Sequence, residues 1–265
     1  MGCYYSRESY SEIEKFIVEI SESQIGFKNF ESKYLDRVIH RYSTFLRISK
    51  PQLNRICCEL KLDEVSNTAL FNQFMVENYY CAKKLSSFGI LLGQGNIESK
   101  CSLYFKNYDI DNSGTLTKNE VEMMLEQIIS MACRVIPKFT EYNNRENPKL
   151  REYTSTLSGL EKGLKKNFLG ILLDEDESLT EGRFIFKCSS TVAQVLTSST
   201  GIRKYAYEIF KEIERSTRII ISNLNIANVA EDNLILKKFN EAKSSKKNKR
   251  KGGLYKPRLN FALNY

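Results

Sequence analysis

The sequence predicts an all-α protein built from helix–loop–helix units. The 265 residues include only 13 glycines and four prolines, and apolar residues recur at helical spacing along most of the chain. One acidic stretch places a series of oxygen-bearing residues between two such helical segments. With 42% hydrophobic and 27% charged residues, the chain can bury a core as one or two compact lobes.

Residues 1–26 are predicted to be an N-terminal segment that is acylated and binds a membrane. The start Met1-Gly2-Cys3-Tyr4-Tyr5-Ser6 fits the N-myristoylation pattern, in which Gly2 is acylated after Met1 is removed. One myristoyl chain binds membranes only marginally, so we expect palmitoylation of Cys3 as a second signal. The alternative is a flexible start without lipid. No stretch approaches the roughly 18 apolar residues of a membrane span, which predicts a protein anchored to a membrane rather than spanning it.

The next segment, 27–94, is predicted to be a helical lobe. Two or three helical stretches run from Phe27 to Leu60, with a break near Ser49-Lys50-Pro51. A further apolar-rich helical region runs from Leu70 to Leu92. Gly93-Gln94-Gly95 then predicts a hinge before the following lobe.

Residues 109–120 read Asp-Ile-Asp-Asn-Ser-Gly-Thr-Leu-Thr-Lys-Asn-Glu, which has the layout of an EF-hand calcium loop. Calcium takes about six to eight oxygen ligands, so its site needs several oxygens turned inward from one tight loop. Gly114 would permit the sharp bend. The predicted metal ligands are Asp109, Asp111, Ser113, Thr115 through its carbonyl, Thr117 through a water, and Glu120 through both carboxylate oxygens.

Magnesium could occupy the same loop, but a bidentate glutamate suits the larger calcium ion better. The flanks also fit helix–loop–helix, because apolar residues follow one helical face on each side. These residues are Cys101, Tyr104, Phe105 and Tyr108 before the loop, and Val121, Met124, Leu125 and Ile128 after it. An acidic surface turn between two ordinary core helices is the alternative.

A second, degenerate loop is predicted from Leu172 to Arg183, in a segment that follows a polar loop (Thr140 to Pro148) and a helix (Leu157 to Leu173). Aligned on the first loop, it places Leu179 opposite Leu116. Leu172, Glu177 and Arg183 replace the first ligand, the bending glycine and the bidentate glutamate. We expect no calcium there, and short strands around Leu116 and Leu179 that bridge the loops. An unrelated acidic loop is the alternative.

The C-terminal part predicts an amphipathic helix followed by a basic tail. Apolar residues keep a helical period from Ile202 to Ile221, so this helix could cover a groove of the lobe, pair with a partner's helix or belong to the core. Residues 237–258 hold ten Lys or Arg against one acid, Glu241, within a total net charge of +8. Such a tail favours anionic lipid at about 1 kcal/mol per basic residue. Nucleic acid, nuclear import and a merely solvated tail are the alternatives; the acyl signal favours the membrane.

The cysteines and the single histidine provide no recognisable catalytic site. The seven cysteines form neither a CxxC pair nor zinc-ligand spacing, which predicts reduced, mostly buried thiols in the cytoplasm. His40 is the only histidine, and we expect it to be a plain helix residue. Without a Ser/His or Cys/His pair or a nucleotide-binding loop, we expect no enzymatic activity.

The Gly2-Cys3 start, the helical N-terminal half and the run from Gly95-Asn-Ile-Glu-Ser-Lys into Tyr108-Asp-Ile-Asp-Asn-Ser-Gly resemble acylated EF-hand calcium sensors. These are the recoverin-like neuronal calcium sensors, calcineurin B and calcineurin B-like proteins, and the likeness covers about residues 95–190. The resemblance implies four hands in two lobes that report calcium to a bound enzyme, channel or kinase. A second loop of the first lobe would then fall at Gln73 to Lys84, which has no ligand set. The chain departs from the pattern by its single intact loop and its basic tail.

These inferences predict five segments: an acylated start (1–26), a degenerate EF-hand-like lobe (27–94), an EF-hand pair with one intact loop (95–200), amphipathic helices (201–236) and a basic tail (237–265). The predicted function is a calcium sensor on the cytoplasmic face of a membrane, which relays calcium to a protein partner. The alternative is a constitutive scaffold or docking subunit, cytoskeletal or ciliary, whose one ion stiffens the fold.

Overall fold

The computed structural model describes residue 10 and residues 12–174, 176–213 and 215–216. The chain divides into two units, Met1–Phe210 and Lys211–Tyr265. Of the second unit, only helical residues at its beginning are described. Gly2, Cys3, most of the predicted segment 201–236 and the basic tail 237–265 lie outside the described residues.

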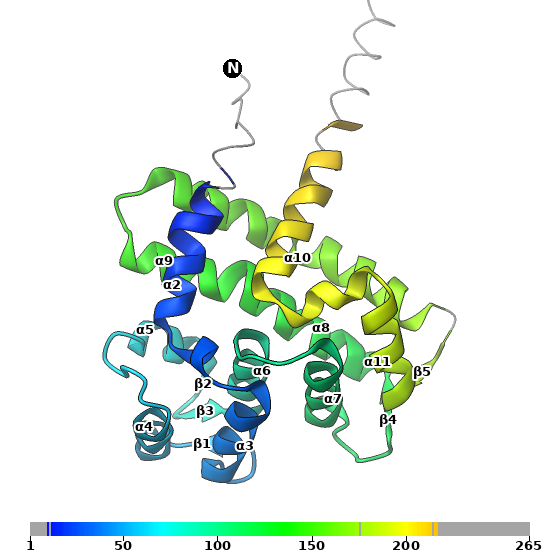
Figure 1. Cartoon of the computed structure of the whole chain (residues 1–265), viewed down its shortest axis with the longest axis horizontal. Helices are drawn as coiled ribbons and strands as arrows, with labels where there is room; N and C mark the ends of the chain where they lie inside the picture. Colours follow the sequence, from blue (N-terminus) through cyan, green and yellow to red (C-terminus); the bar gives the residue numbers. More distant parts are fainter. Residues whose placement is uncertain (1–9, 11, 175, 214, 217–265) are drawn as a thin grey trace, which may run out of the picture. The chain divides into compact units, whose positions relative to one another are not determined.

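The first unit is mostly helical and contains two small sheets (Figure 1). The elements of its first half, in chain order, are η1 (Glu14–Val18), α2 (Glu19–Gln24), η2 (Phe27–Asn29), α3 (Ser32–Tyr42), β1 (Arg47–Ile48), α4 (Lys50–Glu59), α5 (Thr68–Phe71), η3 (Asn72–Phe74), β2 (Met75–Val76), β3 (Tyr79–Cys81) and α6 (Ala82–Leu92).

The second half continues with α7 (Ile97–Tyr108), β4 (Thr115–Thr117), α8 (Lys118–Ser130), η4 (Met131–Val135), α9 (Ile136–Asn143), α10 (Pro148–Leu173), β5 (Ser178–Thr180), α11 (Glu181–Ser190) and η5 (Val192–Thr197). The last described helix begins at residue 199 and runs through residue 213. The expectation of a mainly helical protein is thus confirmed, with strands added at four places where helices meet.

Antiparallel strands join the helices in pairs. In the first half, β1 pairs with β3 at Ile48 and Tyr80, and β2 adds to the other edge of β3. In the second half, β4 pairs with β5, with Leu116 opposite Leu179. The predicted bridging strands around these two leucines are therefore confirmed. Each half consequently contains two helical units joined by strands; one strand lies between the helices of each unit, except in the second unit of the first half, which has both β2 and β3.

The apolar-rich region predicted to be helical from Leu70 to Leu92 is helical at both ends, but β2 and β3 interrupt it, so the prediction is wrong for residues 75–81. This stretch contains Val76, Tyr79 and Tyr80, which are β-branched or aromatic and favour strands. A short apolar run cannot by itself distinguish a strand from a buried helix. The pairing of β3 with β1, more than 30 positions earlier in the sequence, decides between them.

The polar loop predicted from Thr140 to Pro148 is much shorter than expected. Helix α9 continues to Asn143, and α10 already starts at Pro148. Thr140 is buried and donates its hydroxyl hydrogen to the Ile136 carbonyl at 3.0 Å, which lets a polar residue continue the helix. Asn147 caps α10 by accepting from two backbone N–H groups, and proline suits the first helical turn.

Local capping also explains where α4, α7 and α8 begin. Ser49 and Gln52 form a capping box at α4, and Pro51 follows in the first turn. Asn96 caps α7 by accepting from the Ser99 N–H at 2.8 Å. Thr117 and Glu120 form a second capping box at α8. The break predicted near Ser49-Lys50-Pro51 is therefore the start of a helix.

The segment Gly93-Gln94-Gly95, predicted as a hinge, is a short turn that is held on both sides. Ser32 donates its backbone N–H to the Gln94 carbonyl at 2.7 Å, and Gln94 donates to Phe30 at 2.8 Å. A Cβ at Gly93 would lie 2.8 Å from a Leu35 carbon. Close packing against α3 therefore restrains this connection.

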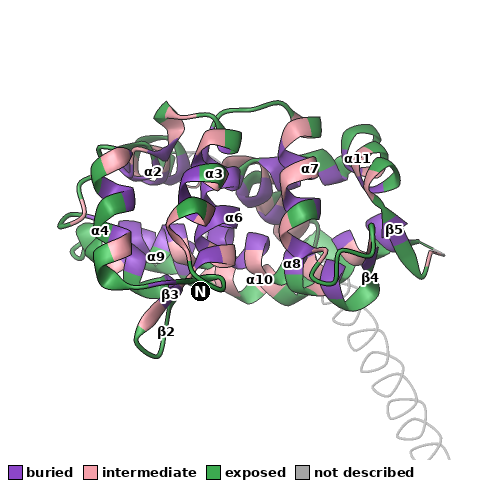
Figure 2. Cartoon of the chain, turned by 90° about the horizontal axis from the view of Figure 1, so that it is seen from below, coloured by how far each residue is buried: buried purple, intermediate pink, exposed green. Residues whose placement is uncertain are grey.

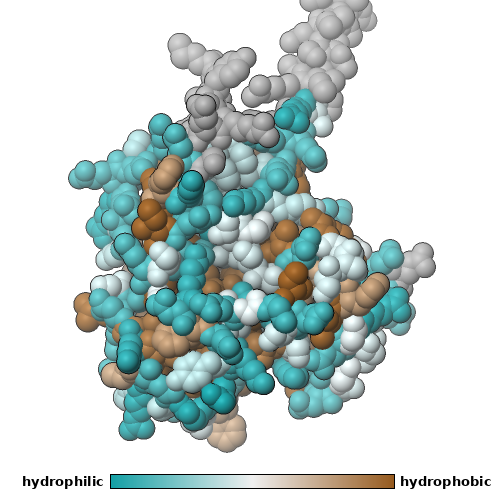
Figure 3. Space-filling view, viewed as in Figure 1, coloured by the Kyte–Doolittle hydropathy of each residue, from teal (hydrophilic) through white to brown (hydrophobic). Residues whose placement is uncertain are grey.

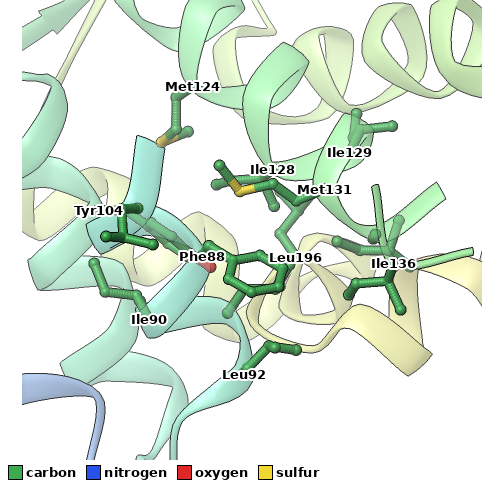
Figure 4. Close-up of a cluster of buried hydrophobic side chains, with 14 of the residues drawn as sticks. Phe88, Ile90, Leu92, Tyr104, Met124, Ile128, Ile129, Met131, Ile136 and Leu196 are labelled. Carbon is green, nitrogen blue, oxygen red and sulfur yellow. The ribbon is translucent and has the colours of Figure 1, made fainter. Parts of the chain in front are cut away.

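One core runs through the first unit. Helix α6 is buried along nearly its whole length and lies among the surrounding helices (Figure 2). Figure 4 shows that side chains from both halves, and from η5 near the end of the unit, pack into one cluster. The labelled members are Phe88, Ile90, Leu92, Tyr104, Met124, Ile128, Ile129, Met131, Ile136 and Leu196.

Lys100 is a buried cation that connects η5 to the rest of the core. Its ammonium donates to the Leu91 carbonyl at 3.1 Å and to the Thr197 carbonyl at 2.9 Å, and the residue is only 7% exposed. Burial lowers the pKa of Lys100 to about 8. Each carbonyl belongs to the end of a helix, so the contact joins the C-terminal ends of α6 and η5.

We expect Lys100 to make stability depend on pH in the alkaline range. Its pKa is about 8 in the folded protein and roughly 10.4 in an unfolded chain. Between these values the unfolded state binds one more proton, so this residue's contribution stabilises the fold as pH rises, by up to about 3 kcal/mol. The measurement is urea unfolding of the wild type and Lys100→Met from pH 7.5 to 10.

The difference between the two proteins is the relevant quantity, because other buried groups titrate in the same range. Burial raises the pKa of Cys57 and of Cys133 to about 12, which lowers stability above the pKa of an unfolded thiol. These contributions cancel in the difference. The free energy of unfolding could instead change with pH in the same way for the wild type and Lys100→Met from pH 8 to 10. That result would show that the two carbonyls keep the Lys100 ammonium charged in the folded protein.

The described cysteines are free, and four of the six are buried, as predicted. Cys58 is exposed and Cys81 is half-buried. Within the described part of the chain, no helix combines the length and the apolar character needed to cross a bilayer.

Candidate metal centre

The loop 109–120 begins where α7 ends and needs two left-handed backbone positions. Asp109 follows α7 and donates its N–H to the Phe105 carbonyl at 2.9 Å. Asn112 has φ +54° and Gly114 has φ +76°. Apart from Gly114 and its two chain neighbours, no residue has an atom within 4 Å of the place where a Cβ of Gly114 would be. The glycine therefore serves the backbone conformation and not a close contact.

The first half of the loop turns its carboxylates inward onto backbone amides. Asp109 accepts from the Ser113 N–H at 2.9 Å and, through its other oxygen, from the Gly114 N–H at 3.1 Å. Asp111 accepts from the same Ser113 N–H at 3.0 Å. Hydrogen bonds from Ser113 lower the pKa of Asp111, which keeps that carboxylate ionised. The two aspartates thus converge on one amide.

Ser113 brings further oxygens to the same place. Its Oγ donates to the Thr115 carbonyl oxygen at 3.0 Å and lies 3.4 Å from Asp109 Oδ1. Four of the six predicted ligand residues, Asp109, Asp111, Ser113 and Thr115, are therefore neighbours through these bonds. Side-chain and carbonyl oxygens of this type are the ligands that calcium and magnesium prefer.

Glu120 bonds to both ends of the loop. One carboxylate oxygen accepts from the Ile110 N–H at 3.2 Å, and the other accepts from Thr117, at 2.9 Å from its N–H and 2.8 Å from its hydroxyl. Glu120 is only 8% exposed. Burial opposes its ionisation, but the Thr117 and Ile110 hydrogen bonds outweigh this and lower its pKa. A charged carboxylate therefore lies at the start of α8.

The residues suit a hard cation by their chemistry, but their carboxylates are not yet gathered around one point. Among the described residues, no group of three or more His, Cys, Asp or Glu side chains has an arrangement that could hold a metal ion. Asp109 and Asp111 bond to the Ser113 amide, whereas Glu120 bonds to Ile110 and Thr117. Thr117 and Glu120, the remaining two predicted ligand residues, are hydrogen-bonded to each other.

The second loop contains cationic side chains of its own. Arg183 and Lys187 each lie 2.8 Å from an oxygen of Asp176. Leu172, aligned with the first ligand position, is fully buried at the end of α10. In the first half of the chain, β2 and β3 lie in the stretch from Gln73 to Lys84 that was predicted to lack a ligand set.

His40 is not the plain helix residue that the sequence predicts. Its Nε2 lies 2.8 Å from Asn107 Oδ1 and 3.3 Å from Asp36 Oδ1. The Asp36 hydrogen bond raises the pKa of His40. The i,i+4 spacing of Asp36 and His40 could have indicated this pair, but the Asn107 contact joins α3 to α7 and has no sequence signal.

Comparison with known proteins adds no family assignment. No protein-family model matches this sequence, and a search of curated proteins finds no match either.

Proposed function

We propose that this chain is a calcium-binding regulatory protein of the EF-hand type, which relays calcium to a protein partner. The observation that carries the proposal is the loop 109–120, in which the oxygens of Asp109, Ser113 and Thr115 lie together between α7 and α8. The strand pair β4–β5, which joins this loop to a second one, supports the same proposal. On this interpretation, the helix–strand–helix units of both halves are paired EF-hands.

Glu120 suggests how an ion would act on the protein. To bind an ion together with Asp109 and Asp111, its carboxylate has to exchange hydrogen bonds to Ile110 and Thr117 for the ion. Glu120 belongs to the first turn of α8, so this movement would rotate that helix. Met123, now 39% exposed, and the buried Met124 follow on α8 and would change their exposure.

The experiment that tests this proposal is a calcium titration of the full-length protein with magnesium present. Calorimetry measures binding, and the fluorescence of an apolar dye measures exposed apolar surface. Micromolar binding with increased dye fluorescence is expected for a sensor. Absence of calcium binding would refute the metal site, and binding without a dye response would refute the sensor.

One observation favours the alternative function, a constitutive scaffold whose ion stiffens the fold. Leu196 of η5 already fills the cluster between α6, α7 and α8 (Figure 4). On the face drawn in Figure 3, polar residues separate several small apolar patches, and no continuous apolar groove is seen. A scaffold would keep this surface with or without calcium.

Membrane anchoring by lipid on Gly2 and Cys3, assisted by the basic tail, is part of the same proposal and rests on the sequence pattern. We expect Gly2→Ala to move the protein from the membrane fraction to the supernatant of lysed cells, because the acyl acceptor is lost. Cys3→Ser should weaken binding as well, while Cys58→Ser, at an exposed thiol within the fold, serves as the matched control. A Gly2→Ala protein that stays in the membrane fraction would identify another anchor, such as the basic tail.

A further inference from the structure

The second loop is closed by an ion pair that forms entirely within the chain. Asp176 lies between two cations, with Arg183 Nη2 2.8 Å from one carboxylate oxygen and Lys187 Nζ 2.8 Å from the other. Lys187 also donates to the Leu173 carbonyl at 3.3 Å, and Asp176 donates its N–H to the same carbonyl at 2.6 Å. The end of α10 is thereby tied to α11.

Both cations project from α11, one turn apart. Their spacing of four residues places them on one face of the helix, next to the loop that leads into it. The side chain of Lys187 is only 14% exposed and that of Asp176 only 20%, so this contact is partly shielded from water. The cations therefore attach the loop to α11 whether or not a metal ion is present.

The segment that these cations hold contacts the first loop through β5. Strand β5 pairs with β4, and Leu116 and Leu179 at the centre of the pair are fully buried. Strand β4 contains Thr115 and Thr117, two of the predicted ligand residues. The position of β5 therefore determines the position of the second half of the loop 109–120.

The start of α11 also contacts the helix that leads into the first loop. Glu181 accepts a hydrogen bond from Ser102 of α7 and lies 4.0 Å from the Lys106 ammonium. The Phe105 and Phe184 rings lie 6.4 Å apart, centre to centre. Residues 178–184 thus contact both α7, which leads into the loop 109–120, and β4, which forms part of its second half.

We propose that Asp176, Arg183 and Lys187 form an internal substitute for a metal ion, which holds the second loop in place and thereby positions the loop 109–120 for its own ion. They are positioning residues and do not contact that ion. The inference rests on the proposed calcium site. Because the ion pairs take the place of a metal ion in the second loop, only the loop 109–120 of this pair binds calcium. Calcium binding to the pair should therefore follow a single-site curve, without cooperativity between the two loops.

The test compares the full-length wild type with the double variant Arg183→Gln/Lys187→Gln. We expect its calcium affinity to fall about three- to tenfold, because each partly exposed pair contributes only modestly to holding β5. Without calcium, the amides of residues 115–117 and 178–180 should exchange hydrogen faster than in the wild type. Lys165→Gln removes a comparable ion pair with Glu126, outside both loops, and is the matched control.

Two further variants separate positioning from general destabilisation. Arg183→Lys keeps the positive charge and should retain most of the calcium affinity of the wild type. Asp176→Asn removes the carboxylate charge and should weaken calcium binding as the double variant does. Calcium affinity and strand exchange that equal those of Lys165→Gln would overturn the proposal. If the wild type binds no calcium, the proposed function fails, and the exchange rates alone decide whether the internal ion pair holds the strands.

Discussion

Replacing Arg203 with methionine is expected to lower the free energy of unfolding by about 3–5 kcal/mol. Arg203 is fully buried in the helix 199–213, where its guanidinium lies 2.8 Å from Glu14 and 2.9 Å from Glu22. Both glutamates are almost completely buried. Methionine would leave two carboxylates in the core without the cation between them, and uncompensated buried charge is strongly destabilising.

Other polar groups complete this cluster and make the cation hard to replace. Tyr153 donates its hydroxyl hydrogen to Glu14, and Ser199 donates to Glu22 at 2.7 Å. Lys28 lies 3.0 Å from Glu22, but its side chain is 38% exposed and the contact is therefore weaker. Burial opposes ionisation of Glu22, and Arg203 and Lys28 outweigh it, so the pKa of Glu22 is lowered.

The lowered pKa of Glu22 gives the direction of the pH dependence. A carboxylate with a depressed pKa in the folded state contributes stability above its unfolded pKa, near 4.3, and loses it as pH falls through the folded value. The wild type should therefore lose stability below about pH 4. Urea unfolding of the wild type and Arg203→Met at pH 7 measures the main effect.

A triple variant tests whether buried charge, rather than lost packing, causes the effect. Arg203→Met combined with Glu14→Gln and Glu22→Gln removes all three charges and should recover much of the lost stability. Arg215→Met, at an exposed position of the same C-terminal region, is the control for the substitution itself. If Arg203→Met and Arg215→Met have equal free energies of unfolding, Arg203 does not stabilise the fold by compensating the buried charges of Glu14 and Glu22.

Glu120→Gln is expected to weaken calcium binding by on the order of a hundredfold or more. The substitution removes one full negative charge from the predicted ligand set and one of the two oxygens of the bidentate ligand. The fold should be preserved, because glutamine can accept from the Thr117 N–H and serve equally in a capping box. The expected loss is therefore in affinity rather than in stability.

Calorimetric titration of Glu120→Gln measures the affinity, and its thermal unfolding without calcium measures the stability. Glu122→Gln, two residues later on α8, makes the same change of charge outside the predicted ligand set. If Glu120→Gln and Glu122→Gln bind calcium with equal affinity, Glu120 is not a calcium ligand.

Many of the helices could be predicted because their signals are local. Apolar spacing predicts the buried faces of α7 and α8. The caps Asn96, Thr117 and Asn147, seen in the structure, stand at positions that their side-chain chemistry favours. The pairing of Leu116 with Leu179 could also be predicted, since two similar loops align on these residues. The sheet of β1, β3 and β2 could not, because strands of two or three residues show no clear period.

In the candidate metal centre, too, the sequence predicted some features and not others. The predicted ligand residues of 109–120 could be selected from the sequence because a calcium loop has all its ligand positions within about 12 residues. The arrangement of these residues could not be predicted from the sequence, because Glu120 can bond either to an ion or to the amides of Ile110 and Thr117. Local hydrogen bonding, which residue spacing does not reveal, joins the Glu120 carboxylate to Ile110 and Thr117 in the structure.

Residue order alone was thus sufficient for the helical class, the oxygen-rich loop and the pairing of the two loop strands, because each depends on neighbours in the chain. Only tertiary contacts decided that Arg203 lies between Glu14 and Glu22, and that Lys100 bonds to Thr197. In the sequence these charged residues are typical of solvated helix faces. They become buried partners because helices nearly 100 to 190 positions apart pack together and exclude water from between them.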